Sequence, residues 1–382
     1  MPTYGAASRK LFWEESMKIV RAMSLLASVA IATTAQAENI DLAYAAYGPP
    51  TSSNVEFGVI PFLETAKEMS NGTINYTLHS GGSLLSAKAM LGGMTDGLVD
   101  GGQLLAVYFP SELPVSNLAM GLAPILRSGG PALAAAITEY VLLDCPECKA
   151  EFAEHNTVFL GAYSTTAYSL LCSKPVATLD DLAGKKVRVP GDFAYLASHL
   201  GMTPVNMSIG ETYEGLQRGA LDCSLGPVGW LEQFSLGEVA PYALDISYGV
   251  SYGGPIISLT QSLWDRLDDT QKTAFETGAA VGVFRAANAY IKTDQDVLAS
   301  AGDKGYTVTE PSAPLVEKLG GFDAAFKEIL LDRAKKGGIE NADEIVSGFE
   351  KTLAKWETIV GEVGDDEDAF VDRMMNEIYS KM

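Results

Sequence analysis

The chain has 382 residues, of which 47% are hydrophobic and 20% are charged. That balance is typical of a soluble globular protein, and the length exceeds the roughly 250–300 residues that one core accommodates, so two lobes are expected. Lys and Arg total 27 against 48 Asp and Glu, which gives a net charge of −21. So acidic a chain is a poor binder of nucleic acid or anionic lipid, and we expect neither as a partner.

Residues 1–37 have the pattern of a Sec-type signal peptide. Lys18 and Arg21 precede a short apolar run, and Ala35-Gln36-Ala37 places small residues where a signal peptidase cleaves. The expected start is Met17, and the expected location of the mature chain is the periplasm. The alternative is an N-terminal membrane anchor, for which the run is short. No later segment offers about 20 apolar residues, so no direct membrane insertion is expected.

Strand-like and helix-like segments alternate along the mature chain, which predicts an α/β fold with a largely parallel sheet. The predicted strands are 40–47, 73–78, 157–163, 185–190, 203–207 and 220–224. The predicted helices are 55–69, 86–98, 179–182, 195–200 and 211–218.

One helix is predicted to be unusually long. No proline occurs between Pro255 and Pro311, and acidic caps precede a helical stripe, so we expect a single helix from Asp269 to Ala301. At 1.5 Å per residue it would measure about 45–50 Å. The tail 322–382 is also predicted to be helical, with breaks near Gly337-Gly338 and Gly364-Asp365.

The motifs of common enzymes are missing from the sequence. It contains no Walker loop, no G-x-S-x-G elbow and no H-E-x-x-H, and His79, His155 and His199 are isolated from one another. We therefore expect no enzyme activity, no catalytic residue, no cofactor and no metal.

Cys145-Pro146-Glu147-Cys148 is the one pattern with a catalytic appearance, because a C-x-x-C at a helix start can lower a thiol pKa. It lies between two predicted helices, 131–143 and 149–155, rather than after a strand. A local structural disulfide is favoured over a redox site. Free thiols, or a zinc site using all four cysteines, are the alternatives.

Arg188 is the most suggestive single residue. It lies on a predicted strand that Pro190 and Gly191 stop, and ligands bind at strand ends in open α/β sheets. A guanidinium group matches carboxylate, phosphate or sulfonate bidentately. From the residue type alone, the alternative is a surface salt bridge.

Three ordered blocks, 180–191, 200–205 and 211–222, read D-L-x-G-x-K-h-R-x-P, L-G-x-x-P and E-h-Y-x-A-L-Q-x-G-x-h-D with small departures. In this order and spacing they resemble the solute-binding proteins of tripartite ATP-independent periplasmic (TRAP) transporters of the C4-dicarboxylate (DctP) type. Upstream, 87–91 and 97–100 are similar to a helix and the following strand entry of that family. The resemblance extends over essentially the whole mature chain.

The resemblance implies a two-lobe periplasmic binding protein fold with a long hinge-crossing helix, closing on a ligand in the cleft. Lobe one would be 38–161 plus 253–299, and lobe two 162–252 plus 300–382 with the C-terminal helices. Arg188 would anchor a small organic anion, a carboxylate or sulfonate. The partners would be a small and a large integral-membrane TRAP subunit, and the chain is expected to be a monomer. The alternatives are an ABC-type periplasmic binding protein and an exported thiol-disulfide oxidoreductase using Cys145 and Cys148.

Two departures from the family pattern bear on the ligand. Tyr163 stands where many members have a second Arg, and Gly226 stands where many have an Asn. We therefore expect neither a sialic acid nor a plain C4-dicarboxylate, but a monoanion with an apolar or hydroxylated body enclosed by aromatic walls. The candidate ligand-binding residues are Arg188, Tyr163, Tyr168, Phe193, Gly226, Trp230 and Tyr213.

Cys172 and Cys223 are predicted to form a second disulfide. Both fall near strand positions on either side of the Arg188 strand, in a chain exported to an oxidising compartment. The alternative is that both are small buried apolar residues.

Overall fold

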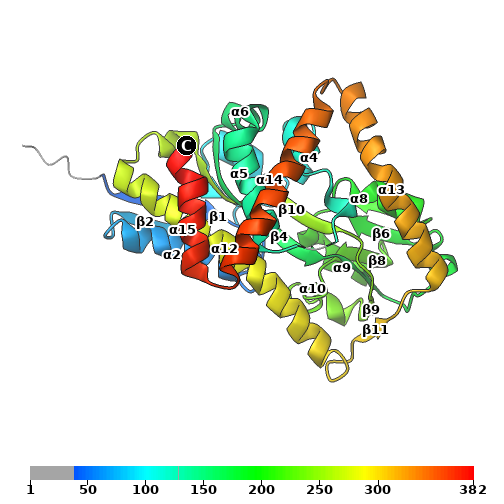
Figure 1. The fold of residues 1–382 in the computed structure, drawn as a ribbon. Helices are drawn as coiled ribbons and strands as arrows, with labels where there is room; N and C mark the ends of the chain where they lie inside the picture. Colours follow the sequence, from blue (N-terminus) through cyan, green and yellow to red (C-terminus); the bar gives the residue numbers. More distant parts are fainter. Residues whose placement is uncertain (1–37, 128) are drawn as a thin grey trace, which may run out of the picture. The chain divides into compact units, whose positions relative to one another are not determined.

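The computed structural model describes residues 38–127 and 129–382, which form an α/β structure built on two mixed sheets (Figure 1). The predicted signal peptide, residues 1–37, lies outside the described residues. Within the described part of the chain, no helix is both long and apolar enough to cross a membrane.

The first sheet has the strand order β2-β1-β3-β10-β4. Strand β1 pairs in parallel with β2 and β3, whereas β10 runs antiparallel to both β3 and β4. The expectation of a largely parallel sheet is therefore wrong, because β10 brings the chain back between β3 and β4. The strands are β1 (Ile40–Ala45), β2 (Ile74–His79), β3 (Gly101–Gly102), β4 (Thr157–Ala167) and β10 (Val250–Thr260).

The second sheet has the order β11-β9-β5-β8-β6-β7. It is parallel from β8 through β6 to β7, and β5 is antiparallel to both of its neighbours, β8 and β9. The strands are β5 (Ser169–Cys172), β6 (Lys186–Val189), β7 (Thr203–Asn206), β8 (Cys223–Gly226), β9 (Tyr242–Leu244) and β11 (Thr307–Thr309).

Helices cover both sheets, and most begin or end where the sequence predicts. The predicted helix 86–98 is a clear exception, because α3 covers only Met90–Thr95. The α-helices before the long one are α2 (Ile60–Met69), α3 (Met90–Thr95), α4 (Pro114–Ala119), α5 (Pro131–Glu139), α6 (Pro146–Glu154), α7 (Leu179–Leu182), α8 (Phe193–His199), α9 (Thr212–Gln217), α10 (Trp230–Gln233) and α11 (Gln261–Trp264).

Helix α12 (Asp269–Ser300) confirms the long helix to within one residue. Its start is fixed by a capping box, in which Asp268 and Gln271 each satisfy the other's backbone N–H. The helix packs on α2 and β4 of the first sheet and continues toward the second, ending near β9 and β11 (Figure 1, yellow). There, Asp294 accepts a hydrogen bond from the backbone N–H of Gly229, just before α10.

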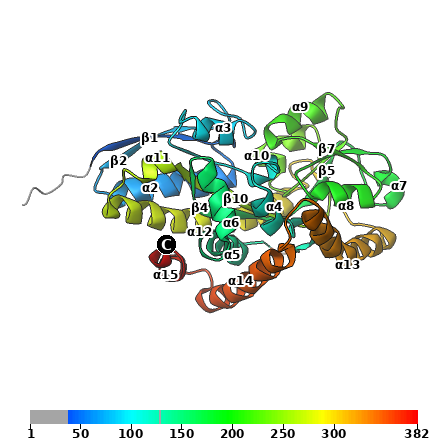
Figure 2. The ribbon, with the colours of Figure 1, turned by 90° about the horizontal axis from the view of Figure 1, so that it is seen from above.

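Three helices form the C-terminal region: α13 (Ala313–Lys336), α14 (Ala342–Val363) and α15 (Glu367–Glu377). Helix α13 contacts α8 of the second sheet, but α14 packs on α5 and α15 on α12 (Figure 2). The Trp356 indole N–H donates to buried Glu139, and the Tyr379 hydroxyl donates to the Leu160 carbonyl. These contacts attach α14 and α15 to the first sheet, whereas the predicted lobe boundaries place them in lobe two.

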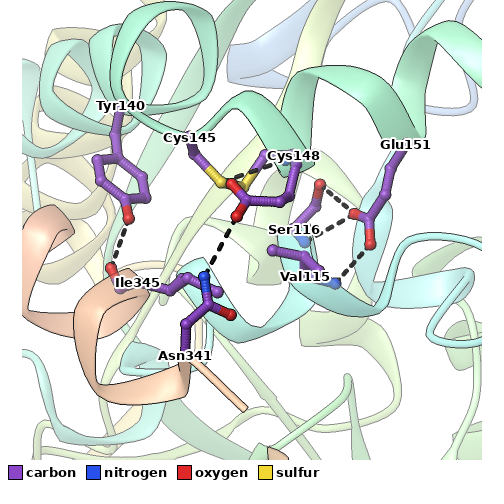
Figure 3. The surroundings of a disulfide bond; sticks show 9 residues. Val115, Ser116, Tyr140, Cys145, Cys148, Glu151, Asn341 and Ile345 are labelled. Carbon is purple, nitrogen blue, oxygen red and sulfur yellow. Dashed lines mark hydrogen bonds between the residues drawn. A yellow bond between two sulfur atoms is a disulfide. The ribbon is translucent and has the colours of Figure 1, made fainter. Parts of the chain in front are cut away.

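The four cysteines form the two predicted disulfides. Cys172 and Cys223 lie directly opposite each other on the antiparallel strands β5 and β8, with Cα atoms 4.0 Å apart. Cys145 is the N-cap of α6 and pairs with Cys148 (Figure 3). Cys145 and Cys148 are 2% and 0% exposed, respectively. Such burial disfavours the thiol exchange that a redox role requires.

Candidate functional site

Arg188 lies in the middle of the second sheet, on β6. The strand pairs with β7 and β8, and its side chains alternate between the two faces, so Val187 and Val189 point one way and Arg188 the other. Pro190 and Gly191 then end the strand. Gly191 adopts φ +47°, in the left-handed region that favours glycine.

The Arg188 side chain is buried, with 1% exposure. Nε donates to the Met207 carbonyl at 2.8 Å, and one terminal nitrogen lies 3.4 Å from the Leu225 carbonyl. The other terminal nitrogen donates to the Tyr108 hydroxyl at 3.0 Å. Among the described residues, no carboxylate forms an ion pair with Arg188, so every one of these partners is a neutral oxygen.

A small cavity of about 10 Å³ lies beside the Arg188 guanidinium. Its walls come largely from segments that follow strands of both sheets, which is where open α/β sheets bind ligands. Arg188 is the only formally charged residue among those that line it. The lining residues are Tyr47, Asn54, Leu105, Val107, Tyr108, Tyr163, Tyr168, Arg188, Pro190, Ile209, Trp230, Phe234, Ser251 and Tyr290.

Tyrosines dominate the cavity wall, and burial keeps four of them protonated. Burial raises the pKa values of Tyr47, Tyr163 and Tyr290 well above the usual range. Burial also raises the pKa of Tyr168 to about 12, although the charge of Arg188 opposes that shift. The wall therefore offers neutral hydroxyl groups and aromatic faces around one cation.

Trp230, at the start of α10, lies against the guanidinium, with the Arg188 Cζ 5.6 Å from the ring centroid. Tyr168 contacts the same indole at 5.7 Å between centroids. Gly226 makes this position possible, because a Cβ atom there would lie 2.1 Å from Trp230 Cε3. Because Gly226 has no side chain, the Trp230 ring occupies the space that an Asn side chain at this position would need.

Not every sequence-predicted residue reaches this cavity. The residues that line it together are Arg188, Tyr163, Tyr168 and Trp230. Gly226 does not line it but packs directly against the Trp230 ring. Phe193 stacks on Tyr168 at 4.9 Å and lines an adjacent cavity of about 360 Å³. Tyr213 lies elsewhere, on α9, where its hydroxyl donates to Glu238.

Sequence reasoning missed Tyr47, Asn54, Tyr108 and Tyr290. The first three lie in the first-sheet segments after β1 and β3, and the fourth lies on α12. A weak signal existed for Tyr47, which directly precedes the Gly-Pro-Pro that ends the first predicted strand. No comparable signal marks Tyr290, which lies inside a long helix.

The chain belongs to the bacterial extracellular solute-binding protein family 7, the DctP family, whose model matches residues 45–335. Members of this family are binding proteins of transport systems rather than enzymes. The match and the solved structures identify the chain as a solute-binding protein of the TRAP class, which was the main prediction from the sequence.

Two relatives and one solved structure illustrate the likeness. A monocarboxylate 2-oxoacid-binding periplasmic protein of Nostoc is 24% identical over 81% of this chain and 84% of its own length. The C4-dicarboxylate-binding protein of Rhodobacter capsulatus is 23% identical over 73% of this chain and 83% of its own. A TRAP solute-binding protein from Rhodoferax ferrireducens, solved with benzoate, is 15% identical, with a TM-score of 0.74 over 84% and 99% of the two chains.

Proposed function

We propose that this protein captures a small monoanionic organic acid, with the ligand's carboxylate or sulfonate bound by Arg188. The supporting observation is a buried guanidinium that has only neutral hydrogen-bond partners. A buried charge without a counter-charge is costly, and an anionic ligand would supply that counter-charge. The Tyr108 hydroxyl, which now accepts from Arg188, belongs to a first-sheet segment and would give way to the ligand.

The present cavity of about 10 Å³ is too small for an organic acid, so the lobes must part before the body of the ligand lies among the tyrosines and Trp230. One cation in a lining of neutral hydroxyls and rings suits one negative charge on an apolar or hydroxylated body. Two relatives support this proposal: the Rhodoferax protein, which was solved with the monoacid benzoate, and the Nostoc protein, which is named for monocarboxylate 2-oxoacids. Sialic acid and plain C4-dicarboxylates remain excluded from it, although the Rhodobacter relative is named for the latter.

The wider role follows from the family. Residues 1–37 direct export to the periplasm, and the mature chain acts there as a monomer. The two lobes close on the ligand about the β4, β10 and α12 crossings and deliver it to a small and a large membrane subunit. In this proposal Cys145 and Cys148 have a structural rather than an enzymatic role, and their burial supports it.

A ligand screen followed by substitution of Arg188 tests the proposal. Thermal shifts with organic acids identify ligands, because a ligand at 100 times its Kd adds about 2.7 kcal/mol of stability. Calorimetry then measures Arg188→Ala, which should weaken binding by about 2–5 kcal/mol, and Arg188→Lys, which should also weaken it because an ammonium cannot bind bidentately.

Arg218→Ala is the matched control, since Arg218 is exposed at the C-cap of α9 and forms an ion pair with Glu214. Its affinity should equal that of the parent protein. Unchanged affinity in both Arg188 variants would overturn the assignment. Micromolar or tighter binding of succinate or sialic acid would refute the ligand class while leaving the role of Arg188 intact.

A further inference from the structure

Arg188 of the second sheet is contacted by a side chain from the first-sheet side. Tyr108 ends a short helical turn, Ala106–Tyr108, which follows β3 and packs on β10 and α4. The turn is anchored there, because Asn117 of α4 donates from Nδ2 to the Ala106 carbonyl at 2.8 Å. The 3.0 Å hydrogen bond from Arg188 to the Tyr108 hydroxyl therefore joins the two sheets.

The two other acceptors of the guanidinium differ from Tyr108, since both come from the second-sheet side. Met207 follows β7, and Leu225 lies on β8. If the two sheets part, these hydrogen bonds can persist, and only the one to Tyr108 has to break. Tyr108 lines the cavity together with Arg188, so its hydroxyl occupies the side of the guanidinium that an anion entering between the sheets would approach.

Other contacts between the same two sides are equally close. Gln233 of α10 donates to the Ser53 hydroxyl at 2.6 Å, and Ser53, which lies between β1 and α2, is 0% exposed. Val107 packs so closely on Gly191 that a Cβ atom at this glycine would lie 2.4 Å from Val107 Cγ2. The cavity of about 10 Å³ beside Arg188 has room for about one water molecule. The protein's own side chains therefore fill the site in this arrangement.

We infer that the protein closes without a ligand and that the Tyr108 hydroxyl then takes the place of the ligand's anion on Arg188, so every ligand competes with an internal contact. The role of the anion rests on the proposed function, whereas ligand-free closure does not. A closed state that occupies its own site lowers the apparent affinity, because only the open fraction of the molecules can bind a ligand. Weakening the closed state should therefore tighten binding.

Tyr108→Phe tests this inference, because it removes the hydroxyl and keeps the ring. Small-angle X-ray scattering of the ligand-free protein should give a larger radius of gyration for this variant than for the parent. The parent should be as compact alone as with saturating benzoate or pyruvate, monoacids of the kinds named for two relatives. In calorimetry, Tyr108→Phe should bind these acids about three- to tenfold more tightly than the parent does, as expected from the loss of one competing hydrogen bond.

Tyr379→Phe is the matched control. The Tyr379 hydroxyl donates to the Leu160 carbonyl of β4 at 2.7 Å, so this hydrogen bond lies on the first-sheet side alone. The control loses a tyrosine hydrogen bond without changing a contact between the sheets. Its radius of gyration and its affinities should therefore equal those of the parent.

A parent protein that is more extended alone than with a bound acid would overturn the inference. So would a Tyr108→Phe variant that stays as compact as the parent, or one that binds either acid no more tightly. If neither acid binds the parent, the ligand-free comparison of the two proteins decides. A wider screen in which no ligand depends on Arg188 would instead refute the proposed function and leave ligand-free closure standing.

Discussion

Gly226 shows how a single residue type sets the character of the site. Any side chain there would enter the space of Trp230, whose ring lies 2.1 Å from the position of a Cβ atom. Because Trp230 covers Arg188, we expect Gly226→Ala to displace the indole and to weaken ligand binding about tenfold or more. Overpacking of this kind also costs roughly 1–3 kcal/mol of stability.

The measurement is calorimetric affinity together with denaturant unfolding. Gly210→Ala is the control, since a Cβ at that exposed position meets nothing within 4 Å. It should leave both quantities near those of the parent. An alanine at position 226 that binds as tightly as the parent would show that Trp230 has no part in holding the ligand.

At this scale, the sequence predicted the site in part. Arg188 could be identified because its strand ends in Pro-Gly within a specific family motif. Asn54, Tyr108 and Tyr290 could not, because residues far apart in the sequence meet only after the two sheets come together. The sequence marked Gly226 only as the loss of a polar contact. The structure shows in addition that the absence of a Cβ atom there makes room for Trp230.

At the scale of elements, the two disulfides should differ in their contribution to stability. The Cys172–Cys223 bridge joins strands β5 and β8 across a sequence separation of 51, whereas Cys145–Cys148 spans only 3. Loop-closure entropy in the unfolded chain therefore predicts about 4 kcal/mol for the longer bridge and about 1.6 kcal/mol for the shorter.

Denaturant unfolding of two double variants checks this order. Cys172→Ala with Cys223→Ala should lose considerably more free energy of unfolding than Cys145→Ala with Cys148→Ala. The second variant is the control for the loss of a buried cystine as such, because all four residues are buried. Equal losses would mean that local packing, rather than chain entropy, governs both bridges.

The elements themselves were largely predictable, and the exceptions have physical causes. Capping residues and an uninterrupted apolar stripe predicted both ends of α12 to within one residue. Strands β5, β9, β10 and β11 were not predicted, and β10 returns antiparallel between β3 and β4. Sheet order depends on contacts between distant segments, which local periodicity does not record.

At the scale of the whole molecule, Asp294 joins three elements at the crossing between the sheets. From α12, its Oδ1 accepts from the Gly229 backbone N–H at 2.7 Å and its Oδ2 accepts from the Thr166 hydroxyl at 2.5 Å. Burial raises the pKa of its carboxyl to about 6, and these hydrogen bonds oppose the shift only in part. The carboxyl therefore titrates close to neutral pH.

This raised pKa gives a signed prediction for stability. The folded protein holds the Asp294 proton more tightly than the unfolded chain does, whose carboxyl has a pKa near 3.9. The stability that protonation contributes is therefore present at low pH and is lost as the pH rises through about 6. Asp294→Asn, which stays neutral, should become more stable relative to the parent across this range, by roughly 2–3 kcal/mol at its plateau.

Chemical denaturation of the parent and the Asp294→Asn variant at pH values from about 4 to 8 measures this difference, and subtraction removes the titrations that both proteins share. Asn can keep the hydrogen bond from Gly229 through Oδ1 and can donate to the Thr166 hydroxyl through Nδ2. Asp296→Asn is the control, because Asp296 lies on the same helix but is exposed and pairs with Lys292. Its difference from the parent should stay small at every pH. A difference for Asp294→Asn that does not change between pH 4 and 8 would show that this carboxyl does not titrate in the fold near pH 6.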